Sequence, residues 1–168
     1  MLGQGFVLTG IFRDGTIRPR MLHQPVINGL EFARTGSTLQ GSYPVADFVR
    51  LRDVLSSDEG MLEYELQGVR EVAGYPALRL KVSGAVQLLC QRCLEAIEHD
   101  MRINVLLQLA ATQAEVDAEP MAAEGPERIA AGREMPVRDL VEDELLLAVP
   151  LAPRHARCGM AGSRSLKP

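Results

Sequence analysis

Residues on either side of a closely spaced cysteine pair alternate between apolar and polar, and this period of two constrains the fold more than any other feature. The alternation runs through residues 78–90 before the pair and through residues 97–109 after it. Side chains of a β-strand point alternately to its two faces, so each run predicts a strand with one buried face. The short connection, which holds Cys90 and Cys93, makes the two strands antiparallel neighbours. We therefore expect a long β-hairpin with a Cys-x-x-Cys sequence at its tip.

An earlier segment extends the predicted sheet. Residues 62–67 also alternate, and the sequence Gly74-Tyr75-Pro76 predicts a turn between this segment and the hairpin. If the two runs pair, acidic side chains of the first lie across from basic side chains of the second, namely Glu63 and Glu65 across from Arg79 and Lys81. Such pairs help to set the register, and each contributes only about 0.2–1 kcal/mol.

Two amphipathic helices are predicted to cover the sheet. One spans about residues 44–56, where apolar residues recur at steps of three and four, and the other spans residues 136–149, which lie between two prolines. The expected fold class is α+β. We expect a small, mainly antiparallel β-sheet from about residue 60 to about residue 110, two or three packing helices and the CxxC-tipped hairpin.

The pattern indicates one domain with an extension at each end. Residues 1–20 show little periodicity, so we expect them to lie outside the folded domain, which spans residues 21–158. Residues 110–135 are rich in alanine and acidic residues and are interrupted by proline and glycine, which predicts a flexible acidic loop within the domain. Residues 159–168 form a basic C-terminal tail.

Charge is distributed unevenly along the chain. Residues 21–151 carry 11 basic and 21 acidic side chains, whereas both ends are basic. An acidic body repels phosphate at long range, which argues against broad nucleic-acid binding and favours a basic protein partner, although a solvated acidic surface without any partner explains the same composition. No segment approaches the ~18 apolar residues that cross a bilayer, and three cysteines suit a reducing compartment, so we expect a cytoplasmic protein with no membrane partner.

The cysteine pair has possible partners far away in the sequence. His155 and Cys158 lie behind the second predicted helix, and two such pairs of sulfur and nitrogen ligands allow one metal ion to join distant segments. Three interpretations compete: a structural zinc site closed by Cys90, Cys93, His155 and Cys158, a reactive dithiol, and thiols that bind no metal. Reactive CxxC pairs begin a helix, whereas strands flank this pair, so the dithiol is the weakest interpretation. The other two stay open.

Catalytic signatures are not found in the sequence. It contains no Walker A, GxGxxG, GxSxG or HExxH motif. Glu142, Asp143 and Glu144 are consecutive on a predicted helix, so they point in different directions around its axis, which predicts a solvated face rather than a catalytic pair. We therefore expect a protein that is not an enzyme and takes no small-molecule substrate.

Several segments together resemble the bacterial YceD family. They are Glu31-Phe32-Ala33-Arg34 with Leu39 and Gly41, Arg52-Asp53-Val54-Leu55, Cys90-Gln91-Arg92-Cys93-Leu94, the helix from Asp139 to Pro150, and then Pro153, His155 and Cys158. The resemblance runs from about Met21 to Cys158. It implies a non-enzymatic ribosome-biogenesis factor that is needed for accumulation of the 23S rRNA of the large subunit, through its synthesis, processing or stability. Many family members carry several cysteines near the C-terminus, where this chain has only Cys158 beside His155.

The resemblance and the charge pattern together predict which residues make contacts. We expect basic residues at the hairpin tip and in the tail to bind RNA phosphate, and the acidic helix to bind a basic ribosomal or RNA-processing protein. The 23S rRNA or its precursor is then bound directly or through that protein. The predicted contact residues are Arg92, Arg154, Arg157, Arg164 and Lys167 for RNA, and Asp139, Glu142 and Asp143 for the protein. Two alternatives stay open: an acidic adaptor that binds proteins without RNA contact, and a redox-active or metal-dependent CxxC protein.

Overall fold

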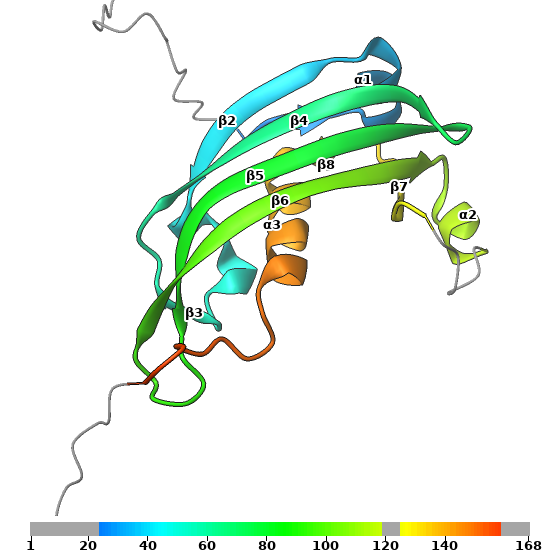
Figure 1. Ribbon diagram of the computed structural model, residues 1–168. Helices are drawn as coiled ribbons and strands as arrows, with labels where there is room; N and C mark the ends of the chain where they lie inside the picture. The colour runs from blue at the N-terminus through cyan, green and yellow to red at the C-terminus, as the bar shows by residue number, and fades with distance from the viewer. Residues whose placement is uncertain (1–23, 119–124, 159–168) are drawn as a thin grey trace, which may run out of the picture.

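A curved β-sheet with its main helices on the concave face forms the body of the protein (Figure 1). The computed structural model describes residues 24–118 and 125–158. The strands of the main sheet follow the order β2-β4-β5-β6-β7, with β3 paired to β5, and a separate two-stranded sheet joins β1 to β8. The strands are β1 Val26–Ile27, β2 Thr38–Pro44, β3 Leu55–Ser57, β4 Met61–Val72, β5 Tyr75–Leu89, β6 Ala96–Ala110, β7 Arg128–Ala130 and β8 Met135–Pro136.

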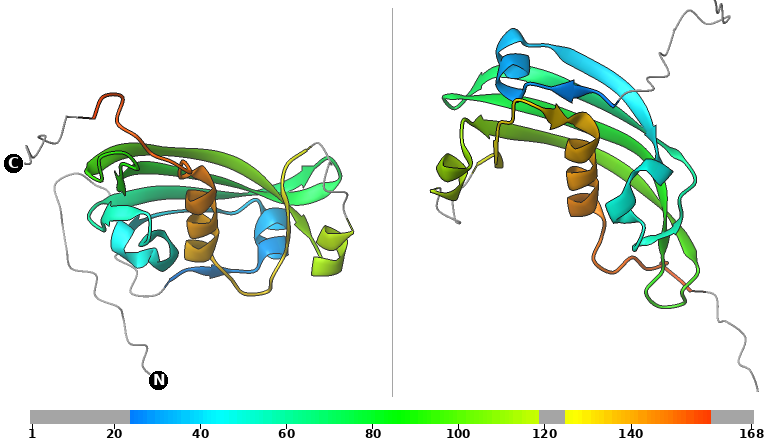
Figure 2. Two further views of the ribbon diagram at one scale, coloured as in Figure 1. Left: turned by 90° about the horizontal axis from the view of Figure 1, so that it is seen from below. Right: turned by 180° about the vertical axis from the view of Figure 1, so that it is seen from behind.

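The helical elements are short except for the last one. They are α1 Gly29–Thr35, the 3-10 turns η1 Val45–Asp47 and η2 Val49–Leu51, α2 Gln113–Asp117, and α3 Val137–Ala148. Views from below and from behind show α1, α3 and the 3-10 turns on the concave side of the sheet, while the convex side carries no helix among the described residues (Figure 2). No described helix is both long enough and apolar enough to span a bilayer.

The predicted hairpin is the centre of the sheet. Strands β5 and β6 pair antiparallel from Ala77↔Gln108 to Leu89↔Ala96, so the six residues between them form its tip. All pairs in the main sheet are antiparallel except β6 with β7. The α+β, mainly antiparallel prediction is therefore confirmed at this level, although the sheet begins with β2 rather than near residue 60.

The register between β4 and β5 confirms one predicted charge pair. Glu65 lies directly opposite Lys81, and their side chains form an ion pair with an Oε1–Nζ distance of 2.8 Å. Glu63, by contrast, faces Ser83, and Gln67 faces Arg79. Because Lys81 is half exposed, solvent screens its ion pair, which helps to set the register more than it stabilises the fold.

The core lies between the concave face and the elements that cover it. Its fully buried members come from β4, β5, β6, the 3-10 turns and α3; the largest of them are Phe48, Leu51, Leu62, Leu66, Leu78, Leu80, Leu88, Met101, Leu107, Leu109 and Leu145. Burial of one such side chain stabilises the fold by about 1.5–3 kcal/mol, so this layer holds α3 firmly against the sheet. The orientation of α3 decides where the chain goes after the helix.

Helix α1 packs closely against β4 at one glycine. Asn28 caps the helix by accepting a hydrogen bond from the Glu31 N–H, and Gly36 ends it with a left-handed conformation, φ 67°. A Cβ atom at Gly68 would overlap the carbonyl oxygen of Phe32. The absence of a side chain at position 68 therefore permits this close approach of the helix to the sheet.

Two predictions about local structure were wrong. The expected helix over residues 44–56 is a pair of 3-10 turns followed by β3. Residues 110–135 are not one flexible loop, because they contain α2, β7 and the first residue of β8, although residues 119–124 lie outside the described chain. The predicted boundary near Met21, the N-terminal extension and the tail 159–168 also lie outside the described residues.

Candidate metal centre

Two segments far apart in sequence meet at one end of the protein. The first is the tip of the β5–β6 hairpin, and the second is the chain that leaves α3 and runs to that tip (Figure 1). A backbone hydrogen bond joins them, in which the Gln91 N–H donates to the Pro153 carbonyl at 2.8 Å. This contact places the histidine and cysteine that follow Pro153 beside the cysteines of the tip.

The four predicted ligands form a compact cluster. The Sγ atoms of Cys90 and Cys158 are 3.7 Å apart, the Cys93 Sγ lies 3.4 Å from the His155 Nδ1, and all four ligand atoms lie within 4.8 Å of one another. Tetrahedral zinc, with Zn–S near 2.3 Å and Zn–N near 2.0–2.1 Å, separates its ligand atoms by about 3.5–3.8 Å. The cluster therefore has the size and the ligand types of a closed site for one metal ion. Such a site leaves no open position for a catalytic water.

The tip has the backbone geometry of a tight turn around a sulfur atom. The Leu94 N–H donates to the Cys90 carbonyl, the Cys90 N–H donates to the Glu95 carbonyl, and Leu94 has a left-handed conformation with φ 59°. Backbone N–H groups, first that of Cys93 and then that of His155, donate to the Cys90 sulfur and lower its pKa to about 5. The turn thus favours Cys90 as a thiolate, which is the form that binds metal.

Neighbouring groups also affect two of the other ligands, Cys93 and His155. The backbone N–H of Glu95 lowers the pKa of Cys93, but burial and the adjacent thiols Cys90 and Cys158 outweigh it, so the net direction is upward. The His155 Nε2 lies 3.1 Å from the Ala96 carbonyl oxygen. A carbonyl only accepts hydrogen bonds, so Nε2 carries the proton and the lone pair of Nδ1 points into the cluster.

Comparison with known protein families places this cluster in context. The family model described as large ribosomal RNA subunit accumulation protein YceD matches residues 78–165, which is slightly more than half of the chain and includes all but the first residues of the hairpin, α3 and all four ligands. The chain belongs to the YceD family. No curated protein and no solved structure shows significant similarity to it. The predicted resemblance is therefore confirmed from residue 78 onward, whereas the predicted family segments between Glu31 and Leu55 lie outside the match. The family name links this YceD chain to accumulation of large-subunit ribosomal RNA.

The end of this YceD protein that contains the four clustered ligands, formed by the hairpin tip and residues 153–158, is here called the metal-cluster end. It is rich in arginine. Arg92, Arg154 and Arg157 are exposed there, and no described acidic side chain forms an ion pair with any of them. The Nε of Arg92 lies 3.0 Å from the Cys158 Sγ, so part of this side chain contacts the cluster. The predicted contact residues Arg164 and Lys167 lie outside the described residues.

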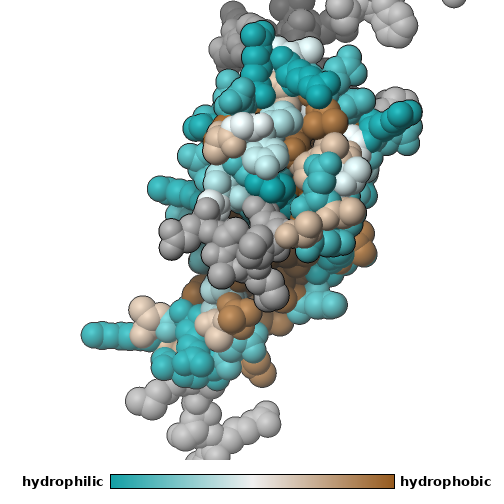
Figure 3. Space-filling view, turned by 90° about the vertical axis from the view of Figure 1, so that its right-hand side faces the viewer, coloured by the Kyte–Doolittle hydropathy of each residue, from teal (hydrophilic) through white to brown (hydrophobic). Residues whose placement is uncertain are grey.

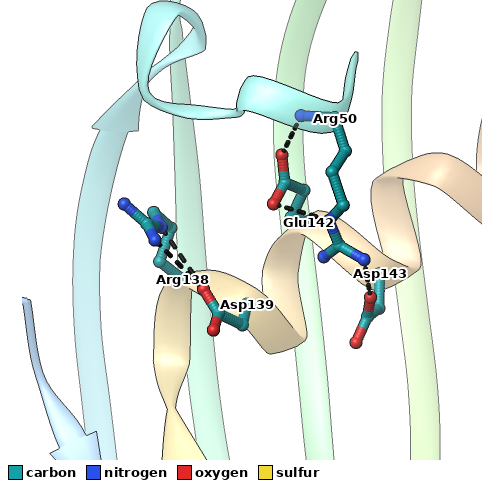
Figure 4. Close-up of polar contacts among 5 residues, drawn as sticks. All are labelled: Arg50, Arg138, Asp139, Glu142 and Asp143. Carbon is teal, nitrogen blue, oxygen red and sulfur yellow. Dashed lines mark hydrogen bonds and ion pairs between the residues drawn. The ribbon is translucent and has the colours of Figure 1, made fainter.

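The predicted partner-contact residues of the acidic helix α3 differ in their exposure. Glu142 is 5% exposed and accepts two hydrogen bonds from Arg50, from the backbone N–H at 2.7 Å and from Nε at 2.9 Å (Figure 4). Asp143 binds the Nη1 of the same arginine at 2.7 Å, and Asp139 lies beside Arg138 at 3.2 Å. Glu142 thus joins α3 to η2, whereas about half of each aspartate side chain remains exposed. Arg50 was missed in the sequence because nothing local connects it to an acid 92 residues away.

Glu144 also contradicts the predicted solvated face. It is 7% exposed and makes no hydrogen bond within the described part of the chain, and burial, followed by the charges of Glu127 and Asp143, raises its pKa. The expectation of a fully solvated run over residues 142–144 was therefore wrong for two of its three members. The structure leaves Asp143 as the exposed member.

Glu144 gives a prediction about the pH dependence of stability. A carboxyl group with a raised pKa in the folded state favours folding below its unfolded pKa, near 4.3, and this contribution is lost as the pH rises through the folded pKa. We expect Glu144→Gln to increase the free energy of unfolding at pH 7.5 by about 0.5–1 kcal/mol, with the difference disappearing at pH 4. Urea unfolding at both pH values measures it, and Glu134→Gln, at an exposed glutamate, serves as the control. An equal gain at both pH values would show that charge burial is not the cause.

Proposed function

We propose that this YceD protein is a non-enzymatic factor that acts in the cytoplasm and binds the 23S rRNA or its precursor through its metal-cluster end. The observation that carries the proposal is that the four-ligand cluster and three exposed arginines lie together where the hairpin tip meets the chain after α3. The family's link to large-subunit ribosomal RNA supports this choice of partner.

The role proposed for the metal is structural. Zinc bound by Cys90, Cys93, His155 and Cys158 would fix the C-terminal segment to the hairpin tip, because each segment supplies two ligands. Residues 149–158 contain no described helix or strand, so few backbone hydrogen bonds hold this segment otherwise. The metal therefore compensates for the weak local structure of the segment.

The rest of the surface favours this end for RNA contact. The convex face of the sheet carries acidic, basic and neutral polar side chains side by side, such as the row Glu65, Lys81 and Asn104. Its aromatic residue among those described there, Tyr75, is covered by the guanidinium of Arg128 at 4.0 Å from the ring centroid. This face is therefore not a platform on which unpaired bases stack. Contact through phosphate at the arginine-rich end fits the charges better.

Neutralising the basic end should weaken RNA binding. The variant Arg154→Gln, Arg157→Gln, Arg164→Gln and Lys167→Gln removes four positive charges, and each lost phosphate contact on single-stranded RNA lowers the slope of log K against log salt by about 0.7. We expect the slope to become less steep by about 2–3, and the RNA affinity at 0.15 M salt to fall at least about tenfold. A salt titration of binding to a fragment of 23S rRNA precursor measures both quantities.

The matched control changes charge at the other end of the sheet. Arg70 and Arg79 are exposed near the β4–β5 turn, which lies away from the hairpin tip (Figure 1). The double variant Arg70→Gln, Arg79→Gln should keep the wild-type salt slope. A loss in the double variant of about half that in the quadruple variant, in proportion to the charge removed, would show that RNA binding depends on total charge rather than on the metal-cluster end.

A protein-binding adaptor is a second candidate, and the exposed surface of α3 favours it. Asp139 and Asp143 are half exposed on this helix, and the apolar side chains of Leu147 and Leu151 follow them with 70% and 105% exposure. The face shown in Figure 3 is mostly hydrophilic, with smaller apolar areas in both its upper and its lower half. A partner recovered from cells that stays bound after nuclease treatment would support the adaptor over direct RNA contact.

The burial of Cys90 counts against the redox alternative. A reactive dithiol needs an accessible attacking sulfur, and Cys90, whose pKa is the one lowered, has no exposed surface. Hydrogen bonds from backbone N–H groups to its sulfur are also typical of metal-bound thiolates. Titration of thiol reactivity before and after metal removal distinguishes the two, because zinc protects its ligands from alkylation.

A further inference from the structure

We propose that Arg92 is a positioning residue for the metal site, which it neutralises and holds together, rather than primarily an RNA contact. This inference rests on the proposed zinc site. Arg92 occupies the third position of the Cys90-Gln91-Arg92-Cys93 turn, and its side chain crosses to the other segment, where Nε lies 3.0 Å from the Cys158 Sγ. It is therefore a direct contact between the hairpin tip and a metal ligand of the C-terminal segment.

The formal charge of the occupied site shows why an arginine is useful there. Three thiolates and a neutral imidazole around a divalent cation carry a net charge of −1. The carboxylate of Glu95, 3.9 Å from the Cys93 sulfur, adds more negative charge on the side of the hairpin. A guanidinium is always protonated, so Arg92 offsets this charge at any pH at which the site forms.

The contact is also directional. A hydrogen bond from a charged donor to a thiolate orients the sulfur and draws electron density from it, in the way that outer donors tune ligands in metal sites. Cys158 has most need of such a donor, because residues 149–158 form no helix or strand, whereas Cys90 and Cys93 are held by the turn.

The neighbouring Arg157 provides a matched control. It precedes Cys158 directly and is exposed, but it makes no described hydrogen bond to any of the three sulfurs. Arg92→Gln and Arg157→Gln therefore remove the same charge beside the same ligand, and only the first removes the N–H···S bond. Arg92→Lys keeps the charge without the planar donor.

The test measures zinc affinity by competition with a chromogenic chelator. Loss of an outer-shell partner typically weakens metal binding by 10–100-fold, so we expect about this loss for Arg92→Gln, a smaller loss for Arg92→Lys and less than about threefold for Arg157→Gln. Cobalt-substituted protein gives a second readout, since loss of the bond to Cys158 should shift the thiolate-to-cobalt charge-transfer band in Arg92→Gln alone. The metal-free forms of the wild type and of the three variants should have the same melting temperature, which separates an effect on the metal site from an effect on the fold.

The outcomes distinguish this inference from the proposed function. If the wild-type protein binds zinc, and Arg92→Gln and Arg157→Gln bind it with equal affinity, the role of Arg92 is overturned and the zinc site stands. Wild-type protein that binds no zinc would overturn both. Loss of RNA affinity in Arg92→Gln with unchanged zinc affinity and unchanged cobalt spectrum would assign Arg92 to RNA instead.

Discussion

Replacing Cys90 with serine is expected to abolish stoichiometric zinc binding and to release the C-terminal segment from the hairpin. Purified wild-type protein should contain about one zinc per chain, and Cys90→Ser much less, because three remaining ligands bind zinc far more weakly than four. Zinc at 100–1,000 times its dissociation constant stabilises the folded state by about 3–4 kcal/mol, and the variant should lose this increment. Elemental analysis and urea unfolding with and without chelator measure the two effects.

Trypsin provides an independent readout of the released segment. Arg154 and Arg157 lie in it, so cleavage there should be slow in zinc-loaded protein and fast in Cys90→Ser. Cys90 is fully buried, so the serine could also disturb the fold directly. His155→Ala, at a partly exposed ligand, therefore serves as a second variant with the same expected loss of zinc. Full zinc occupancy in both variants would show that these residues do not form the site.

Replacing Glu142 with alanine should destabilise the fold by about 2–3 kcal/mol. The change removes a nearly buried carboxylate that accepts charge-assisted hydrogen bonds from Arg50, and it leaves the backbone N–H of Arg50 without an acceptor. The cost is below that of a fully buried pair because the Arg50 side chain is half exposed. Urea unfolding measures the change, and near-ultraviolet circular dichroism or NMR spectra confirm that the variant remains folded.

The adjacent Asp143 supplies the control for Glu142. It binds the same guanidinium but is 56% exposed, so Asp143→Ala should cost less than about 1 kcal/mol. Glu142→Gln keeps one oxygen acceptor and should fall between the two alanine variants. If Glu142→Ala and Asp143→Ala lowered the free energy of unfolding by equally small amounts, Glu142 would not join α3 to η2. The prediction that Glu142 contacts an external partner would then be favoured again.

The sequence predicted the hairpin and its cluster because both depend on strong, regular signals. Strict alternation over residues 78–90 and 97–109 allows few registers, and two short ligand pairs far apart in the sequence favour a shared site. The distances among Cys90, Cys93, His155 and Cys158 agree with that interpretation. The orientation of His155 by the Ala96 carbonyl, however, depends on a backbone position that no sequence pattern reveals.

Other elements were missed for identifiable reasons. Val45, Phe48 and Leu51 are spaced by three residues, which is the period of a 3-10 helix, and this spacing was interpreted as an α-helix. Helix α1 carried a signal that was not used: Asn28 precedes Glu31 by three residues, and Gly36 follows the last turn. Strand β7 has only three residues and pairs with β6 in parallel, so its alternation is too short to detect.

Glu142 and Glu144 show the limit of reading charge from sequence. Both were expected on a solvated face, yet one meets Arg50 from a segment 92 residues away and the other is covered without a described hydrogen bond. Side chains from distant segments decide such burial, so the composition of one helix does not predict it.

Cross-linking of the zinc-loaded protein to RNA in cells tests the central claim most directly. Ultraviolet irradiation, capture of the protein and mass spectrometry identify which peptides carry nucleotides, and sequencing identifies the RNA. The account predicts cross-links to the 23S rRNA or its precursor within residues 90–96 and 153–158, the two segments that supply the four clustered ligands. Cross-links confined to the convex face of the sheet or to α3, or recovery of the protein without ribosomal RNA, would contradict it.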